Sequence, residues 1–95
     1  MITLIVRMRF APEDHAEVQS ILLELTAASR AEAGCVNYIP HFNADKPDAV
    51  VIYEQYRDEE ARKAHRASPH FVRLATGGLY RLMKARSIED LTAIA

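Results

Sequence analysis

The hydrophobic pattern of residues 2–10 constrains the fold of this chain more than any other feature. Apolar residues fill every second position, and the residues between them turn polar toward the end, at Arg7 and Arg9. Side chains of a strand point alternately to opposite faces of a sheet, so the alternation predicts a strand with one buried face. That face would consist of Ile2, Leu4, Val6, Met8 and Phe10. Such a strand needs partner strands and a layer that covers its apolar face.

The pattern then changes to that of a helix. Pro12 suits a first helical turn because it has no N–H to leave unpaired, and Glu13 and Asp14 favour the positive end of the helix dipole. Apolar residues follow at the three- and four-residue spacing of an amphipathic helix; they are Val18, Ile21, Leu22, Leu25 and Ala28. Gly34 is predicted to follow the helix in a left-handed conformation.

Two strands are predicted next, over residues 35–42 and 49–56. They flank a segment rich in Asn, Asp and Pro, which is typical of a turn, so they are expected to pair antiparallel. Beyond them, Asp58 and Ser68, which is followed by Pro69, are each expected to cap a short helix.

Gly77 and Gly78 are expected to weaken or end the second of these helices. Residues 87–94 are predicted to form a final strand, although Glu89 and Asp90 are poor strand formers. The resulting order, β-α-β-β-α-α-β, predicts an α+β fold of the ferredoxin-like, split βαβ type, with one antiparallel sheet and helices on one face.

The 95 residues are enough for a single domain, 1–95, with a small core. The chain offers no further element to cover the second face of the sheet. A second copy packed sheet against sheet would cover it, so a homodimer is expected.

Composition argues against several classes of partner. The 12 basic and 13 acidic residues give a net charge of -1, and no segment concentrates the basic ones, so nucleic acid is not expected. No apolar run approaches the roughly 20 residues that cross a bilayer, so no membrane contact is expected. Met1 leads into the first strand without a signal-peptide pattern, which favours a cytoplasmic protein.

Cys35 is the only cysteine, so it is interpreted as a small buried hydrophobe.

His65 is the first candidate for chemistry. It lies near the end of the helix that starts after Asp58, and an imidazole, with a pKa of about 6.5, moves protons readily near neutral pH. A helix-end His favoured by the dipole is the alternative.

His70 could be a surface residue, a pocket donor or a dimer contact, and the sequence does not choose among these roles. Phe71 and Tyr80 are interpreted as core residues that can also stack on a substrate ring or donate a hydroxyl.

Tyr53 and Glu54 point to opposite sides of their strand, so they cannot act from the same face. Which face holds Glu54 is left open. A carboxylate toward the dimer seam would need an arginine partner, such as Arg7 or Arg9, and a structural ion pair is the favoured interpretation of Glu54.

The preceding strand places Cys35, Asn37, Ile39 and His41 on one face by the same alternation. Asn37 could hold a substrate carbonyl or a developing oxyanion, and His41 could reach the same ligand. A satisfied edge amide and a solvated histidine are the alternatives. The four His residues, at 15, 41, 65 and 70, show no zinc-type spacing, so no metal site is predicted.

Together these residues resemble the antibiotic biosynthesis monooxygenase domain family, and the resemblance covers nearly the whole chain. It is carried by Glu32-Ala33-Gly34-Cys35, Asn37-Tyr38, Tyr53-Glu54, His65 and Ser68-Pro69-His70-Phe71. The family implies a dimeric α+β barrel. Its quinol and polyphenol oxidisers imply a cofactor-independent monooxygenase that oxidises a small phenolic or quinol substrate with dioxygen.

In that chemistry the enzyme removes a phenolic proton and the small aromatic substrate itself reacts with dioxygen, so no cofactor is expected. His65 would be the base, Tyr53 or Tyr80 would orient the substrate, and Asn37 would stabilise an oxygen. Phe71 would form an apolar wall, with His70 and His41 as further substrate contacts.

Two other functions remain open. The motifs also resemble family members that isomerise phosphorylated signalling sugars, which would need a charged pocket supplied by Arg7, Arg30, Arg66 or Arg73. A non-catalytic dimer that binds a small ligand is the third possibility.

Overall fold

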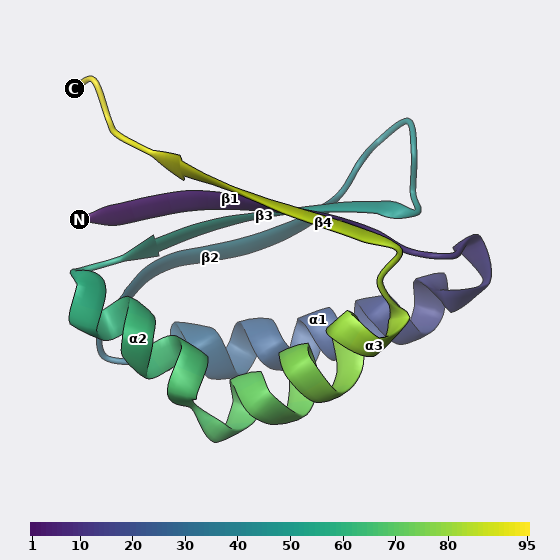
Figure 1. The fold of residues 1–95 in the computed structure, drawn as a ribbon, viewed down its shortest axis with the longest axis horizontal. Coiled ribbons are helices and arrows are strands. Elements are labelled where there is room, and N and C mark those ends of the chain that lie inside the picture. Colours follow the sequence, from purple (N-terminus) through teal and green to yellow (C-terminus); the bar gives the residue numbers. More distant parts are fainter.

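Four strands form one antiparallel sheet, and the helices all lie against one of its faces (Figure 1). The computed structural model describes residues 1–95, with strands β1 (Ile2–Arg9), β2 (Cys35–Phe42), β3 (Ala49–Tyr56) and β4 (Ala85–Leu91). Their order across the sheet is β2-β3-β1-β4, and every neighbouring pair is antiparallel. This is the ferredoxin-like, split βαβ arrangement, so the predicted fold class is confirmed.

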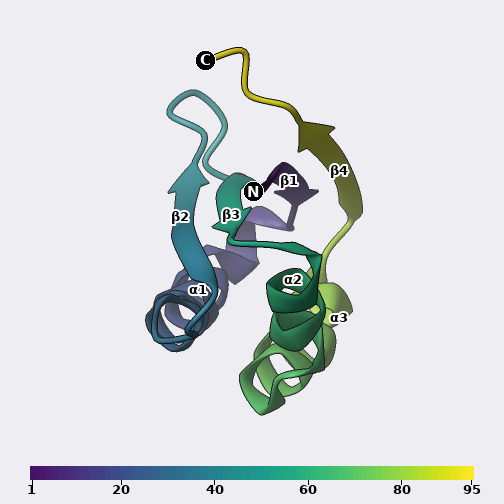
Figure 2. The ribbon, with the colours of Figure 1, turned by 90° about the vertical axis from the view of Figure 1, so that its left-hand side faces the viewer.

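The helical layer has two parts. A 3₁₀ turn, η1 (Pro12–Asp14), leads into α1 (His15–Arg30), and after β3 come α2 (Glu59–Ala67), the π-helix η2 (Phe71–Leu79) and α3 (Tyr80–Leu82). Figure 2 shows α1 below β2, with α2 and α3 nearer to β4. None of these helices combines the length and the apolar character needed to cross a membrane.

The core lies between the helices and one face of the sheet. The predicted alternation in β1 and the predicted stripe in α1 both face it, with Ile21 at its margin. Its main residues are Leu4, Val6, Met8, Val18, Leu22, Leu25, Val50, Ile52, Leu74 and Leu79. Burial of these side chains at about 1.5–3 kcal/mol each is the main force that holds the layers together.

Gly34 does not have the predicted left-handed conformation, because no glycine in the chain has a positive φ. Space explains its presence instead. A Cβ at this position would overlap the Cβ of Ala61 in α2. Gly34 therefore lets the segment before β2 lie directly against α2.

The helix does not end at Gly77 and Gly78. The wider π-helical turn of η2 passes through both glycines, and α3 continues to Leu82. A Cβ at position 78 would lie 3.2 Å from Ile21 Cδ1, so the glycine allows η2 to approach α1 closely. The final strand was predicted over residues 87–94 but spans Ala85–Leu91, where it pairs with β1.

The second face of the sheet, called the outer face below, has no helix on it (Figure 2). It carries alternate residues of the strands, including Ile5, Val51, Tyr53 and Ile39. The homodimer that would cover this face stays a prediction. Strand β4 pairs only with β1, and all seven of its residues are exposed.

Candidate active site

A cavity of about 30 Å³ lies between the sheet and the helices. Apolar residues of β1 and η2 form much of its wall, and the polar residues around it are Tyr38, Glu54, Arg62, His65, Arg66, Tyr80 and Arg86. A volume of about 10–15 Å³ is enough for one water. The cavity as it stands therefore holds a molecule of the size of dioxygen or about two waters.

His65 is held at the cavity wall by the short helix α2. The Asp58 carboxylate accepts a hydrogen bond of 2.9 Å from the Ala61 N–H and so caps the first turn, as predicted. Ser68 has an extended backbone that stops the helix, and its hydroxyl donates to the His65 carbonyl at 2.6 Å. The helix is thus fixed at both ends, and His65 points inward with 3% of its surface exposed.

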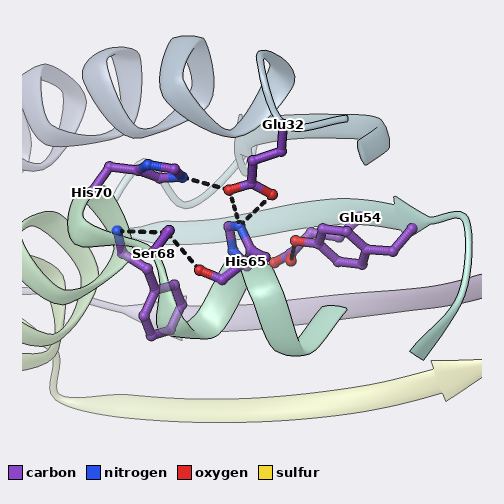
Figure 3. Close-up of polar contacts among 7 residues, drawn as sticks. Glu32, Glu54, His65, Ser68 and His70 are labelled. Carbon is purple, nitrogen blue, oxygen red and sulfur yellow. Dashed lines mark hydrogen bonds and ion pairs between the residues drawn. The ribbon is translucent and has the colours of Figure 1, made fainter. Parts of the chain in front are cut away.

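Glu32 binds both His65 and His70 (Figure 3). His65 Nδ1 lies 2.9 Å and 3.1 Å from the two carboxylate oxygens, and His70 Nε2 contacts one of them. An ionised carboxylate only accepts hydrogen bonds, so His65 Nδ1 carries the hydrogen. The neutral imidazole then has an acceptor at Nε2, which no other side chain of the protein binds.

Glu32 was part of the motif that carries the family resemblance, but the sequence suggested no role for it. It lies in the turn between α1 and β2, 33 residues before His65, and the close contact of this segment with α2, at Gly34 and Ala61, brings the two together. A carboxylate that binds Nδ1 of an imidazole and leaves Nε2 free is an arrangement that general base catalysis uses. His70 contacts the same carboxylate and so lies beside the Glu32–His65 pair.

Aromatic rings surround His65 on the cavity side. Its ring centroid lies 5.1 Å from that of Phe71, 5.1 Å from that of Tyr56 and 5.7 Å from that of Tyr38. Phe71 also meets Tyr80 edge to face, with centroids 6.1 Å apart. Phe71 and Tyr80 line the cavity beside His65, and the setting suits an aromatic ligand. Their role in substrate binding stays a prediction.

Glu54 faces the helices, which answers the question that the sequence left open. It is 6% exposed and does not face the proposed dimer seam, where Arg7 or Arg9 would have been its partner. The favoured structural ion pair is wrong: the Tyr56 hydroxyl donates to Glu54 at 2.5 Å, while Arg7 pairs with Glu89. Burial raises the pKa of the Glu54 carboxyl. The Tyr56 hydrogen bond and the charges of His65, Arg66 and Arg86 act in the opposite direction but only reduce this increase. Burial and the Glu54 charge raise the pKa of the Tyr56 phenol, so Tyr56 stays a donor.

Three predicted site residues, Asn37, His41 and Tyr53, lie on the outer face. Asn37 donates to the Gln55 side chain at 2.6 Å, and His41 Nδ1 donates to the Val51 carbonyl at 3.2 Å. Tyr53 lies between Ile5 and Ile39 in the strand pairing. The sheet separates these residues from His65 within one chain, and their part in catalysis stays a prediction.

The alternation predicted that Cys35 and Asn37 share one face of the strand, and this prediction is wrong. The pairing of β2 with β3 shifts between these two residues, and such a bulge reverses the side chains that precede it. Cys35 packs against the core and Val36 is 46% exposed instead. Burial, and then the charge of Glu32, raise the pKa of the Cys35 thiol, which agrees with its interpretation as a packing residue.

Glu32, His65 and His70 also form a set that can hold a metal ion, because their ligand atoms lie within 4.8 Å of one another. Two imidazoles and one carboxylate are ligands that iron and zinc accept. The hydrogen bonds of Glu32 account for the same arrangement without an ion. The histidine spacing could not reveal this set because its three residues come from separate segments, and the absence of a metal stays a prediction.

Comparison with known proteins places the chain in a family. The sequence profile of a family described as antibiotic biosynthesis monooxygenase matches residues 1–76. The candidate monooxygenase Rv0793 of Mycobacterium tuberculosis is 31% identical over 71 residues, which are 75% of this chain and 69% of that protein.

Solved structures agree. The crystal structure of PA3566 from Pseudomonas aeruginosa is 33% identical, with a TM-score of 0.91 over 99% of this chain and 94% of the other. A structure described as an antibiotic biosynthesis monooxygenase has a TM-score of 0.93 at 24% identity over the whole of both chains, and it supports the fold. The profile match and the relatives together show that this chain belongs to the antibiotic biosynthesis monooxygenase family.

Proposed function

We propose that this protein is a cofactor-independent monooxygenase that oxidises a small phenolic or quinol substrate with dioxygen. The observation that carries the proposal is the Glu32–His65 pair at the wall of a cavity lined by aromatic rings. Family membership supports a monooxygenase-like role in general. The site adds a positioned base beside surfaces that suit an aromatic ring.

His65 Nε2 accepts the phenolic proton, and the charge of Glu32 stabilises the imidazolium that forms. The phenolate shares its negative charge with the ring carbons, and dioxygen forms a C–O bond to one of them. The O–O bond of the resulting hydroperoxide then breaks. His65 returns the phenolic proton to the peroxide, and the C–H bond at the oxygenated carbon breaks as its electron pair forms the new carbonyl and cleaves the O–O bond. One oxygen stays as that carbonyl and the other leaves as water, whose two hydrogens are the phenolic proton and the C–H hydrogen.

An aromatic substrate requires a larger space than the cavity of about 30 Å³. The wall toward β4 is the one that can open, because β4 is exposed along its whole length and is paired only with β1. Phe71 and Tyr80, both partly buried, border the cavity there. Binding is expected to move these two rings apart.

The proposed enzyme is a homodimer in which two outer faces pack together. This face has apolar residues on neighbouring strands, among them Ile39, which is 37% exposed, and no element of the chain covers it. A second copy would bring Asn37 and Tyr53 into the interface. A cytoplasmic location also remains a prediction.

Oxygen uptake with a panel of hydroquinones and anthrone-like phenols, in metal-free buffer, tests the proposed function. Wild type should consume oxygen with at least one of them, and His65→Ala should lower the rate at least a hundredfold. His15→Ala is the matched control, since this histidine lies at the start of α1, contacts the Pro47 carbonyl and does not line the cavity, and it should keep the wild-type rate. Equal rates for wild type and His65→Ala would reject the proposal, and no uptake with any substrate would favour a binding protein.

The isomerase of a phosphorylated sugar has one observation in its favour, the position of Arg66 at the cavity. The other three arginines named for it are engaged elsewhere. Arg7 pairs with Glu89, Arg73 pairs with Glu24, and Arg30 donates to the Tyr38 carbonyl. Protection of His65 by a sugar phosphate from chemical modification, without oxygen uptake, would support this function instead.

A further inference from the structure

Positively charged side chains outnumber negatively charged ones around the cavity. Three arginines face it, Arg62, Arg66 and Arg86, against one carboxylate, Glu54. Arg62 is neutralised, because it pairs with Glu59 at 2.7 Å and with Asp90 at 3.0 Å. Arg66 and Arg86 have no ion-pair partner in the chain, so they leave two uncompensated guanidinium groups.

These two arginines lie at the open side of the cavity. Arg86 belongs to the exposed strand β4, and Arg66 to the exposed surface of α2 across from it. The Arg86 guanidinium is 4.8 Å from the centre of the Tyr80 ring, a distance typical of a cation–π contact. Arg86 is therefore held at the place where a ligand would enter, next to an aromatic ring that would meet the ligand.

Neutralisation of the Glu54 charge does not explain why Arg66 and Arg86 lie at the cavity. The positive charges of Arg66 and Arg86 act on the Glu54 carboxyl, but neither guanidinium lies within ion-pair distance of it. The hydrogen bond that Glu54 accepts comes from Tyr56. Each of the two guanidinium groups keeps its N–H donors free for a ligand.

Building on the proposed function, we propose that the substrate is a phenol that carries a carboxylate group. Arg66 and Arg86 bind the carboxylate at the mouth, because the planar guanidinium fork matches a carboxylate and needs no deep burial to do so. The ring passes between Phe71 and Tyr80, and the hydroxyl reaches His65. The cavity then has a base at its inner end and an anion site at its outer end.

Calorimetric binding under anaerobic conditions tests this assignment, with 4-hydroxybenzoate and neutral hydroquinone as probes of similar size. Wild type should bind the carboxylated probe about tenfold or more tightly than the neutral one, as charged hydrogen bonds predict. Arg66→Gln and Arg86→Gln should each reduce this preference severalfold and leave hydroquinone binding unchanged. Arg81→Gln, which makes the same change of charge at an exposed site of α3 away from the cavity, should keep the preference.

Equal affinity of wild type for both probes would overturn the assignment. So would an Arg81→Gln variant that loses as much preference as the other two, because the effect would then come from net charge. Since binding is measured without dioxygen, the two proposals can fail separately. Preferred binding of the carboxylated ring without later oxygen uptake rejects the monooxygenase alone, and uptake with neutral quinols without any preference rejects the anion site alone.

Discussion

In the proposed mechanism, Glu32 fixes the tautomer of His65 and stabilises the imidazolium that forms when His65 accepts the phenolic proton. Glu32→Gln keeps an oxygen that can accept the Nδ1 hydrogen bond but removes the negative charge. We expect kcat for oxygen uptake to fall by about tenfold to a hundredfold or more, with little change in KM, the usual cost of altering a group that orients a histidine. Steady-state oxygen uptake measures this, with Glu24→Gln, exposed in α1 beside Arg73, as the matched control. An unchanged kcat would show that Glu32 has only a structural role.

Glu54 makes the stability of the fold depend on pH. Burial raises the pKa of its carboxyl above the usual 4.5, so the folded chain holds this proton more tightly than the unfolded chain. The contribution is present at pH values below 4.5 and is lost as the pH rises through the raised pKa. Glu54→Gln, which stays neutral, should therefore gain stability relative to wild type as the pH rises above 4.5. Denaturant unfolding at a series of pH values measures the difference, and curves that stay parallel would contradict it.

The cluster of Glu32, His65 and His70 can be tested for a metal directly. In the proposed mechanism Glu32 accepts hydrogen bonds from both imidazoles, so the reaction needs no ion there. Treatment with a strong chelator followed by dialysis should leave the rate of oxygen uptake unchanged. Loss of activity that zinc, iron or manganese restores would instead assign these three residues as metal ligands.

At the scale of elements, the contact between the start of β2 and α2 places His65. Gly34→Ala would put a methyl group against the Ala61 methyl and should destabilise the fold by about 1–3 kcal/mol, the usual range for overpacking. Thermal unfolding measures this. The double variant Gly34→Ala, Ala61→Gly should recover most of the loss, since the second change removes the methyl group in contact. No recovery would mean that the glycine is needed for another reason.

Most elements of this fold were predictable because their signals are local. The alternation of β1, the stripe of α1 and the caps at Asp58 and Ser68 each depend on residues within one turn or one strand, and the structure confirms them. The errors have physical causes as well. The helix continues through Gly77 and Gly78, where Gly78 lies close to Ile21 of α1, and the bulge after Cys35 is a shift in the pairing of two strands. Both features involve residues distant in sequence, which local patterns do not report.

At the level of the whole molecule, the proposed dimer depends on the outer face. Ile39→Lys would place a charge in the proposed interface, where burial without a partner is costly. Wild type is expected to sediment as a dimer and the variant mainly as a monomer, in analytical ultracentrifugation over a range of concentrations. Leu23→Lys is the matched control, since Leu23 is 66% exposed in α1. A wild-type protein that stays monomeric would reject the dimer.

Periodicity, caps and a family motif are properties of neighbouring residues, so they were enough to predict the fold class and the order of the elements and to single out His65 as a candidate. Which candidates meet depends on the tertiary packing. It brings Glu32, His65 and His70 together from three separate segments, and it separates Asn37 and Tyr53 from them by the thickness of the sheet. Side chains distant in sequence meet only where packed layers place them, and the register of a sheet, altered by one bulge, sets the face on which each residue acts.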